Sequence, residues 1–498
     1  MRVTVTHPRS AEAALRVPRT DVVIERSDDG RFVAERGPFS HYERCLHVDG
    51  DHVVETTEFH LAVPFWWFLF VLPFRSALRR PAQRRSRRPW WAPPEPLDQR
   101  ASTVLGLLCL LVLIDGFVGT LLTQTLTYAA REFGVDRGGQ GTVLAVARVG
   151  ALVALGAGVL SDRLGRRRPI VVCAAGACVF AALGSVAPHV AWLTVTQVAA
   201  AGCAGALGVL VAIVSAEEVP AGSRAYAYSL IIMTGGLGAG ICVWALPLAD
   251  TGTRGWRWIY AIAIVGLALV APVARRLPES RRFAPELSGA PRGSQPTMAD
   301  HGRRFWLLAA AGFLIASFAS PAFQFQNDFL RQDRGFSAAR IALFTVVTGT
   351  PAGASILAGG RLADVRGRRL VGATGILGGA AGTVGMFAIA GWPMWGVSIA
   401  GSVVGGFTVP ALGVYRPELF PTALRGRAAG ALEVIGVSGS AAGLLFVGSL
   451  ADRWGSYAGP IALASIATIF VVVLVLVLFP ETAQRSLEEL NPEDRPPR

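Results

Sequence analysis

The chain has 498 residues, of which 52% are hydrophobic and only 16% are charged. Soluble domains carry charge on about a quarter of their residues, so this composition excludes an ordinary soluble protein. The formal net charge is +13, and the sequence contains arginine but no lysine. In a soluble protein this charge would suggest nucleic acid. Here the arginines stand in short segments between apolar runs, as in membrane proteins, and we expect no nucleic-acid partner.

Residues 1–61 have the character of a small soluble extension. Polar and apolar side chains alternate over residues 20–60, and the sequence Asp49-Gly50-Asp51 is typical of a turn. Alternation with a period of two predicts strands. We therefore expect a β-rich extension, in the form of a small antiparallel β-meander.

An apolar run covers residues 62–74 and contains Pro64 and Pro73 near its ends. It is too short to span a bilayer comfortably, which predicts an interfacial or re-entrant segment. A first transmembrane span is the alternative. An arginine-rich tract at 75–88 and a linker rich in proline and tryptophan complete the segment 62–102. We expect the basic tract to lie at the anionic, cytoplasmic leaflet.

Twelve further apolar runs are each long enough to span a bilayer. They fall into two groups of six, separated by a basic loop at 275–304. The expected spans are 103–128, 140–160, 170–186, 191–214, 225–248, 257–274, 305–327, 338–358, 369–388, 395–415, 425–449 and 457–479.

The arginine-rich segments between these spans all fall on one side of the predicted bundle. The loops near Pro188 and Trp392, on the other side, carry no basic residue. Arginine-rich loops stay in the cytoplasm, so both termini are expected there. The use of arginine alone is typical of a GC-rich bacterial genome. We expect a multi-pass protein of the bacterial inner membrane.

Three motifs recur at a nearly constant distance along the chain. Residues 158–168 and 360–369 share the pattern G-x-L-x-D-x-x-G-R-R, and their aspartates are 202 positions apart. A Pro-x-x-x-Arg motif recurs 201 positions apart, at Arg224 and Arg425. A Pro-Glu pair follows the sixth and the twelfth span, 202 positions apart. A constant offset over three motifs indicates that a six-helix unit was duplicated.

These motifs resemble those of the major facilitator superfamily, and the resemblance covers residues 103–490. It implies an all-α membrane fold of twelve transmembrane helices in two six-helix halves, at 103–274 and 305–479. A central loop at 275–304 joins the halves, and a tail follows at 480–498. In this class of transporter the substrate site lies between the repeats, near mid-membrane. The resemblance implies a small-molecule substrate and no cofactor or metal; we expect a monomer.

The repeated loop motif sets acidic side chains beside arginines at the cytoplasmic helix ends. In similar transporters such residues form a charge lattice that steadies the outward-open state and breaks when the halves rock. Buried ion pairs are costly to break singly and suit such a switch; simple positive-inside anchoring is the alternative. The residues expected in this gating motif are Gly158, Asp162, Arg163, Gly165, Arg166, Arg167, Glu218, Arg224, Glu279, Gly360, Asp364, Gly367, Arg368, Arg369, Glu418, Arg425 and Glu481.

Ionisable residues at bilayer depth are functional candidates because they are expensive to bury. Asp115 and Arg148 lie about 18 Å and about 21 Å from the cytoplasmic ends of neighbouring spans, and this equal depth predicts that they pair. No histidine is expected at mid-membrane, so a carboxyl group must carry any coupled proton. Asp115 is the first candidate and Glu433 the second; a static pair is the alternative. Ser317 and Thr350 stand at the repeated positions, which places proton coupling mainly in the N-terminal half.

Several fragments resemble particular branches of the family. The sequence Pro278-Glu279-Ser280 and the tail motif at 480–489 resemble sugar and metabolite porters, whereas Asp115-Gly116-Phe117 resembles the aromatic-acid:proton symporters. The paired glutamines of sugar porters are not matched. These features favour proton-coupled symport of a small organic solute (metabolite, organic acid or sugar-like). A proton-coupled efflux antiporter is the alternative.

Polar and aromatic residues along the spans are weak candidates for substrate contacts. These are Phe117, Gln124, Trp244, Phe323, Gln324 and Asn327. An ordinary helix end that meets water explains Gln324 and Asn327 equally well, and lipid-facing packing is the favoured explanation for each of the others. The chain has no Walker loop, HExxH motif or His/Cys cluster. We therefore do not expect an enzyme, and a membrane-embedded enzyme is a remote alternative.

Overall fold

The computed structural model describes residues 1–80, 88–135, 137–283 and 297–494. Within these ranges twelve helices are long and apolar enough to cross a membrane. This confirms the expected all-α membrane fold. Parts of the predicted basic tract, central loop and tail, at 81–87, 284–296 and 495–498, lie outside the described residues.

The first six membrane-crossing segments lie close to the expected spans. The second consists of α4, the short 3-10 segment η2 and α5, and the sixth consists of α9 and α10. The bounds are α3 (Gln99–Phe133), α4 (Arg137–Ala147), η2 (Arg148–Ala151), α5 (Leu152–Leu164), α6 (Arg167–Gly184), α7 (Val190–Glu218), α8 (Arg224–Trp244), α9 (Trp256–Ala261) and α10 (Ala263–Arg276).

The second six segments repeat this order. The tenth is broken into three helices around the glycines at 405–406 and 413. The bounds are α11 (Gly302–Gln324), α12 (Gln326–Gln332), α13 (Ala338–Arg366), α14 (Arg368–Ala388), α15 (Trp392–Gly405), α16 (Thr408–Gly413), α17 (Tyr415–Glu418), α18 (Arg425–Trp454) and α19 (Ala458–Val473), which continues as a π-helical turn (Leu474–Leu478).

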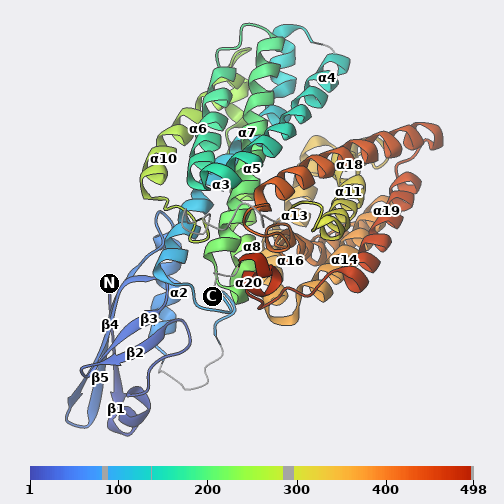
Figure 1. Ribbon diagram of the computed structural model, residues 1–498. Coiled ribbons are helices and arrows are strands. Elements are labelled where there is room, and N and C mark those ends of the chain that lie inside the picture. Colours follow the sequence, from blue (N-terminus) through green and yellow to red (C-terminus); the bar gives the residue numbers. More distant parts are fainter. Residues whose placement is uncertain (81–87, 136, 284–296, 495–498) are drawn as a thin grey trace.

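The two halves meet at one end and diverge towards the other (Figure 1). The end where they meet carries the arginine-rich loops after α5 and α13, and we call it the basic end. The N-terminal extension and the C-terminal tail both lie there (Figure 1). Across the interface α5 packs on α18 and α8 packs on α13. Far from the basic end, Trp244 of α8 and Phe323 of α11 are 81% and 80% exposed.

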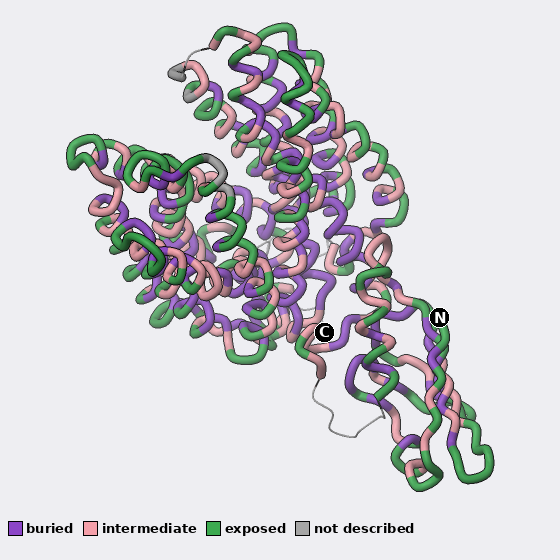
Figure 2. The backbone as a smooth tube through the Cα atoms, turned by 180° about the vertical axis from the view of Figure 1, so that it is seen from behind, coloured by how far each residue is buried: buried purple, intermediate pink, exposed green. Residues whose placement is uncertain are grey.

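Small residues let the helices within each half approach closely. A Cβ on Gly116 of α3 would lie 2.0 Å from the carbonyl oxygen of Gly235 on α8. In the other half, a Cβ on Gly443 of α18 would lie 2.0 Å from the carbonyl oxygen of Ser317 on α11. In lipid, where apolar burial gives no driving force, such close backbone packing holds helices together. Figure 2 shows the buried residues running through the middle of both bundles.

The extension forms a five-stranded antiparallel sheet beside the basic end, with the strand order β1-β5-β4-β3-β2. Strands β2 to β5 follow one another as a meander, and the turn at 49–51 joins β4 to β5 as expected. Strand β1 was not predicted; it pairs with β5 at the edge. The bounds are β1 (Arg2–Pro8), α1 (Glu12–Leu15), β2 (Ile24–Asp28), β3 (Arg31–Arg36), β4 (Phe39–Asp49) and β5 (His52–Leu61).

A single short helix, α2 (Trp67–Leu78), connects the sheet to the linker. Phe74 and Leu78 on one face pack into the core of the sheet, while Phe68 on the other face is exposed. The indole N–H of Trp66 donates to the carbonyl oxygen of Gly106 in α3, at 3.0 Å. The start of α2 therefore lies beside the first membrane helix. Its interfacial or re-entrant character stays a prediction.

We expect Gly116→Val to destabilise the N-terminal bundle, because the new side chain would meet the backbone of α8. Overpacking of this kind costs about 1–3 kcal/mol. Gly119 on the same helix has open space around its Cβ position, so Gly119→Val is the matched control. Thermal unfolding of the purified protein should give a clearly lower Tm for the first variant only. Equal Tm values would contradict the close contact.

Candidate functional site

An aspartate at the end of α5 binds the start of a helix in the other half. The Asp162 carboxylate accepts hydrogen bonds from the backbone N–H groups of Gly426 and Arg427, both at 2.9 Å, in the first turn of α18. Free N–H groups and the helix dipole make a helix N-terminus favourable for a carboxylate. Asp162 of the N-terminal half thus caps a helix of the C-terminal half.

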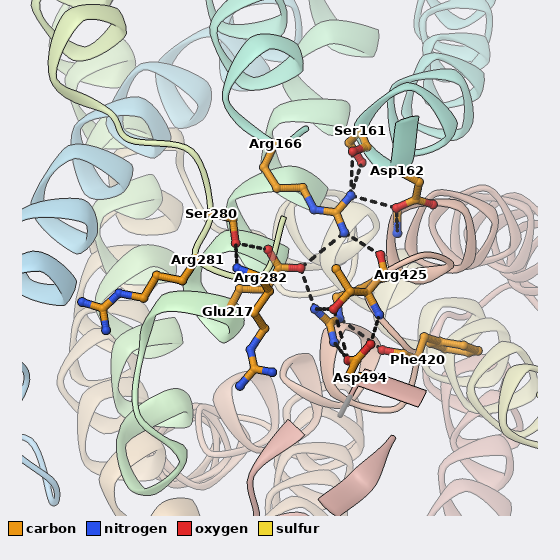
Figure 3. A network of polar contacts seen from close by, with 12 residues as sticks. Ser161, Asp162, Arg166, Glu217, Ser280, Arg281, Arg282, Phe420, Arg425 and Asp494 are labelled. Carbon is orange, nitrogen blue, oxygen red and sulfur yellow. Dashed lines mark hydrogen bonds and ion pairs between the residues drawn. The ribbon is translucent and has the colours of Figure 1, made fainter. Parts of the chain in front are cut away.

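Buried arginines extend this contact along the basic end (Figure 3). The Arg166 guanidinium donates to Asp162 at 2.9 Å and to Glu217 at 3.3 Å. The Glu217 carboxylate also accepts from Arg425 of the C-terminal half, at 2.5 Å. All of these side chains are almost completely buried. Losing one partner would therefore leave an uncompensated buried charge, which costs about 3–5 kcal/mol.

The C-terminal half contains the same arrangement, in which its own aspartate caps a helix of the N-terminal half. Asp364, at the end of α13, accepts from two backbone N–H groups in the first turn of α8, at 3.1 and 2.9 Å. Arg368 binds both Asp364 and Glu418, and Glu418 accepts from Arg224 of the N-terminal half at 3.2 Å. We use the term charge lattice for Asp162, Arg166, Glu217 and Arg425 together with Asp364, Arg368, Glu418 and Arg224.

Glu217, rather than the expected Glu218, belongs to this lattice. It precedes Glu418 by 201 positions, the offset that also relates the two arginines of the Pro-x-x-x-Arg motif, so the repeat itself could have identified it. Glu218 points elsewhere and binds Arg100 at 3.1 Å and Arg281 at 3.3 Å. Both partners precede the C-terminal half, so Glu218 does not join the halves.

Two glycines in each motif copy have a clear structural role. A Cβ on Gly158 would lie 2.2 Å from a carbonyl oxygen of α18, and one on Gly360 would lie 2.6 Å from a carbonyl oxygen of α8. These glycines permit the close approach of the halves. Gly165 and Gly367 have φ values of 91° and 99°, a left-handed region that strains other residues.

Glu279 and Glu481 cap α6 and α14, the helices that begin directly after these glycine turns. Glu279 accepts from the backbone N–H of Arg166 at 2.6 Å, and Glu481 accepts from that of Arg368 at 3.0 Å. Burial alone would raise the pKa of Glu481, but the backbone donors, first of them Arg368, hold this pKa below its usual value. Each acid stays within its own half, so these contacts fix the turns.

Three motif arginines lie at the edge of the lattice. Arg167 donates to the carbonyl oxygen of Ala274 at 2.7 Å, and Arg369 donates to that of Val475 at 3.2 Å. Arg163 is exposed. The two described contacts remain within one half. A gating role for these three residues stays a prediction.

The C-terminal tail adds contacts at the basic end that the sequence did not indicate. Asp494 accepts from Arg425 at 3.2 Å (Figure 3). Glu488, in the short helix α20 (Leu487–Leu490), binds Arg282 of the loop that follows α10, at 2.6 Å. The tail therefore links its own half to the loop that follows α10.

The N-terminal linker also touches both halves. The carbonyl oxygen of Trp91 accepts from the hydroxyl group of Tyr226 on α8, at 2.6 Å. The next carbonyl oxygen, of Ala92, accepts from Arg361 on α13. Since α8 and α13 belong to different halves, the linker straddles their junction.

Asp115 and Arg148 do not bind each other, and the predicted pair is wrong. Arg148 donates to the hydroxyl group of Ser440 on α18 at 2.7 Å, and this hydroxyl donates to Ser320 on α11 at 2.6 Å. Oδ1 of Asp115 is buried without a hydrogen-bond partner among the described residues. Depth along a helix fixes one coordinate only. Arg148 lies in η2, which packs against α18 and α7.

Glu433 forms an ion pair that the sequence did not reveal. Its carboxylate binds Arg416 of α17 at 2.7 Å, and both side chains are about one third exposed, at 33% and 35%. Gly312 and Gly436 leave room for the guanidinium, whose Nη2 atom lies 3.7 Å from the Cβ position of each. Arg416 escaped prediction because the expected tenth span ended one residue before it.

A family model described as Major Facilitator Superfamily matches residues 108–329 and 305–497, and so covers both helix bundles and the lattice between them. The chain belongs to the major facilitator superfamily. This confirms the resemblance inferred from the repeated loop motifs. Membership of a transporter family also excludes the membrane-embedded enzyme that stood as a remote alternative.

Relatives in this superfamily carry transporter names. A gallate transporter of Pseudomonas putida is 27% identical over 199 residues, which are 39% of this chain and 43% of that protein. The match thus spans less than half of the relative. The glucose transporter GlcP of Staphylococcus epidermidis is 24% identical over 77% of this chain and 95% of its own. Among solved structures, the proton:xylose symporter XylE has a TM-score of 0.67 at 17% identity, covering 79% and 98% of the two chains.

The weak candidates for substrate contacts occupy different surroundings in this superfamily member. Phe117 is buried and Gln124 is half-buried, both on α3. The other four, Trp244, Phe323, Gln324 and Asn327, are exposed towards the end opposite the basic end. Exposure alone does not separate a substrate pathway from a lipid contact. A role of these six residues in binding stays a prediction.

Replacing Glu217 by Gln should loosen the contact between the halves, because two buried arginines lose their common partner. Glu218→Gln is the matched control, since its partners lie on one side of the interface. Spin labels would be placed at two exposed positions, Arg168 on α6 and Arg366 on α13. Pulsed electron paramagnetic resonance would then measure the distance between the two halves at the basic end. We expect a longer-distance population for Glu217→Gln only. Matching distributions for both variants would refute the distinction.

Proposed function

We propose that this protein is a secondary active transporter that moves a small organic solute across the membrane by alternating access. The observation that carries the proposal is the charge lattice, in which each half caps a helix of the other through Asp162 and Asp364. These contacts join the halves at the basic end only as long as both partners are in place. A structure held in this way has two natural states, with the lattice formed or broken.

The described conformation is then the outward-open state. Arginine-rich loops stay in the cytoplasm, so the basic end faces the cytoplasm together with both termini, in a bacterial inner membrane. The lattice closes that side, while the diverging ends of the halves face outwards (Figure 1). The linker contacts of Tyr226 and Arg361 add to what must separate when the cytoplasmic side opens.

The substrate proposed is a small polar solute, with organic acids favoured over sugars. Arg148 of the N-terminal half donates to the hydroxyl group of Ser440 in the C-terminal half, which in turn donates to Ser320. A second arginine, Arg416, binds Glu433 within the C-terminal half. Guanidinium groups are suited to binding carboxylates by paired hydrogen bonds. The names of the relatives, a gallate and a glucose transporter, include both chemistries.

Coupling to protons is proposed to run through Asp115, as a symport. Its carboxyl group has a buried oxygen without a donor among the described residues, and ionising such a group is costly. Glu433, whose carboxylate is bound by Arg416 at 2.7 Å, is the second candidate for carrying the proton. Proton-coupled efflux by antiport is the second candidate, since the same groups would serve either direction.

Transport by the purified protein in proteoliposomes tests the proposal directly. Gallate-like aromatic acids and simple sugars would be offered with and without an imposed pH gradient. Uptake driven by an inward proton gradient supports symport, whereas efflux driven by the same gradient supports antiport. If neither class of solute moves under any gradient, the proposed substrate class is wrong.

Asp162→Asn should lower transport by more than tenfold while leaving expression near normal, because it weakens the cap that α18 receives in the outward-open state. Asp452, exposed near the far end of α18, gives the matched control Asp452→Asn, which should transport normally. Uptake into proteoliposomes, normalised to the amount of folded protein, is the measurement. Normal uptake by Asp162→Asn would contradict the proposed role of the lattice.

Asp115→Asn should abolish accumulation against a gradient, because the amide cannot take up a proton. Exchange of labelled for unlabelled substrate needs no net proton movement and should persist. Asp328→Asn, at an exposed position of α12, is the control and should keep both activities. Accumulation that survives unchanged in Asp115→Asn would place the coupling group elsewhere.

A further inference from the structure

A pocket with a volume of about 110 Å³ lies between the N-terminal extension and the N-terminal half. Its walls come from α2, the linker, the start of α3 and α8 as far as Leu237, with Pro38 and Val63 beside the sheet. This is room for a chain of several methylene groups, since a single water needs only about 10–15 Å³ by a comparable measure. The pocket lies outside the interface between the halves and belongs to neither the lattice nor the mid-depth charges.

The lining is almost entirely apolar, but it includes one buried hydroxyl group that lacks a hydrogen-bond partner among the described residues. Ser102 of α3 lines the pocket and is only 2% exposed, and its hydroxyl group has no hydrogen-bond partner among the described residues. By contrast, the hydroxyl groups of Tyr226 and Thr234, which also line it, donate to backbone carbonyl oxygens. A buried hydroxyl without a partner is costly. Ser102 is therefore placed to donate to a ligand.

The pocket opens towards an exposed apolar surface, which we expect to face lipid. Leu69 of α2 and Leu237 of α8 line it and are 52% and 51% exposed. The outer face of α2 continues this apolar surface with Trp67, Phe68 and Leu72, which are also exposed. An apolar pocket continuous with a lipid-facing surface is accessible to the hydrocarbon chains of the bilayer.

Basic side chains stand at the other end of α2. Arg75, Arg79 and Arg80 follow the residues of α2 that line the pocket, and the latter two are exposed. Lys and Arg side chains near a membrane surface attract anionic lipid headgroups, each by about 1 kcal/mol. The extension therefore combines an apolar pocket with a cationic edge, which is the complement of an anionic lipid.

We propose that this pocket binds an acyl chain of an anionic membrane phospholipid, with the Ser102 hydroxyl donating to the ester carbonyl oxygen. The depths agree with this orientation. Ser102 lies three residues from the start of α3, at the basic end, where an ester group would sit. Leu237 lies thirteen residues into α8, about 20 Å from the start of that helix by the helical rise, where the chain would lead. The lipid would hold α2 and the linker against α8.

The first test uses phosphatidylglycerol with a diazirine in the middle of one acyl chain, in proteoliposomes of the full-length protein. After irradiation, labelled peptides are identified by mass spectrometry. We expect labels concentrated on α3 and α8 around the pocket. Leu237→Trp, which blocks the mouth, should lower this labelling at least fivefold. Leu463→Trp, at an exposed position of α19 in the other half, should leave it unchanged.

Even labelling over all exposed helix faces, or labelling insensitive to Leu237→Trp, would overturn the site.

The second test addresses Ser102 and does not depend on blocking the mouth. Native mass spectrometry would count bound phosphatidylglycerol and its diether analogue, which lacks the ester carbonyl. The wild type should retain the ester lipid about two- to tenfold better, as one hydrogen bond allows.

Ser102→Ala should remove that preference without loss of folded protein, because the hydroxyl has no described partner to lose. An unchanged preference for the ester in Ser102→Ala would refute the assigned hydrogen bond. Both tests read lipid binding and not transport. Their outcome is therefore separate from whether the protein moves an organic acid, a sugar or neither.

Discussion

The arrangement of this protein depends on buried carboxylates that each half lends to the other. Asp162 and Asp364 cap the first turns of α18 and α8, and Glu217 and Glu418 each bind an arginine from the opposite half. A buried ion pair adds little net stability when intact, but it is strongly unfavourable when one partner is removed. Separation of the halves is therefore favourable only if water reaches all members of the lattice at the same time.

This requirement explains the repeated glycines. The carboxylates reach the opposite helix only because Gly158 and Gly360 allow backbones to approach within contact distance. Gly165 and Gly367 then turn the chain sharply, so that Arg166 and Arg368 point back to the aspartates. In this motif the close packing of the helices, the glycine turn and the ion pairs therefore depend on one another.

Much of this could be predicted from the sequence, because duplication repeats both residues and their surroundings. Twelve spans, two halves and most lattice residues follow from apolar length and from the constant offset. The failures concern direction around a helix. Glu218 was chosen over its neighbour Glu217, and Asp115 was paired with Arg148 on depth alone. Strand β1 and Arg416 were missed at segment boundaries, where periodic patterns are short and give little guidance.

The mid-depth charges follow a different rule from the lattice, since they are not duplicated. From the sequence, Asp115 and Arg148 indicated that coupling belongs to the N-terminal half. Arg416 and Glu433 are contributed by the C-terminal half, where they form an ion pair. Arg148 of the N-terminal half donates to Ser440 of the C-terminal half, so this contact is sensitive to the separation of the halves. In the proposed transporter, the symmetric lattice would supply the two states, and the unsymmetric charges at mid-depth would bias them when a ligand or a proton binds.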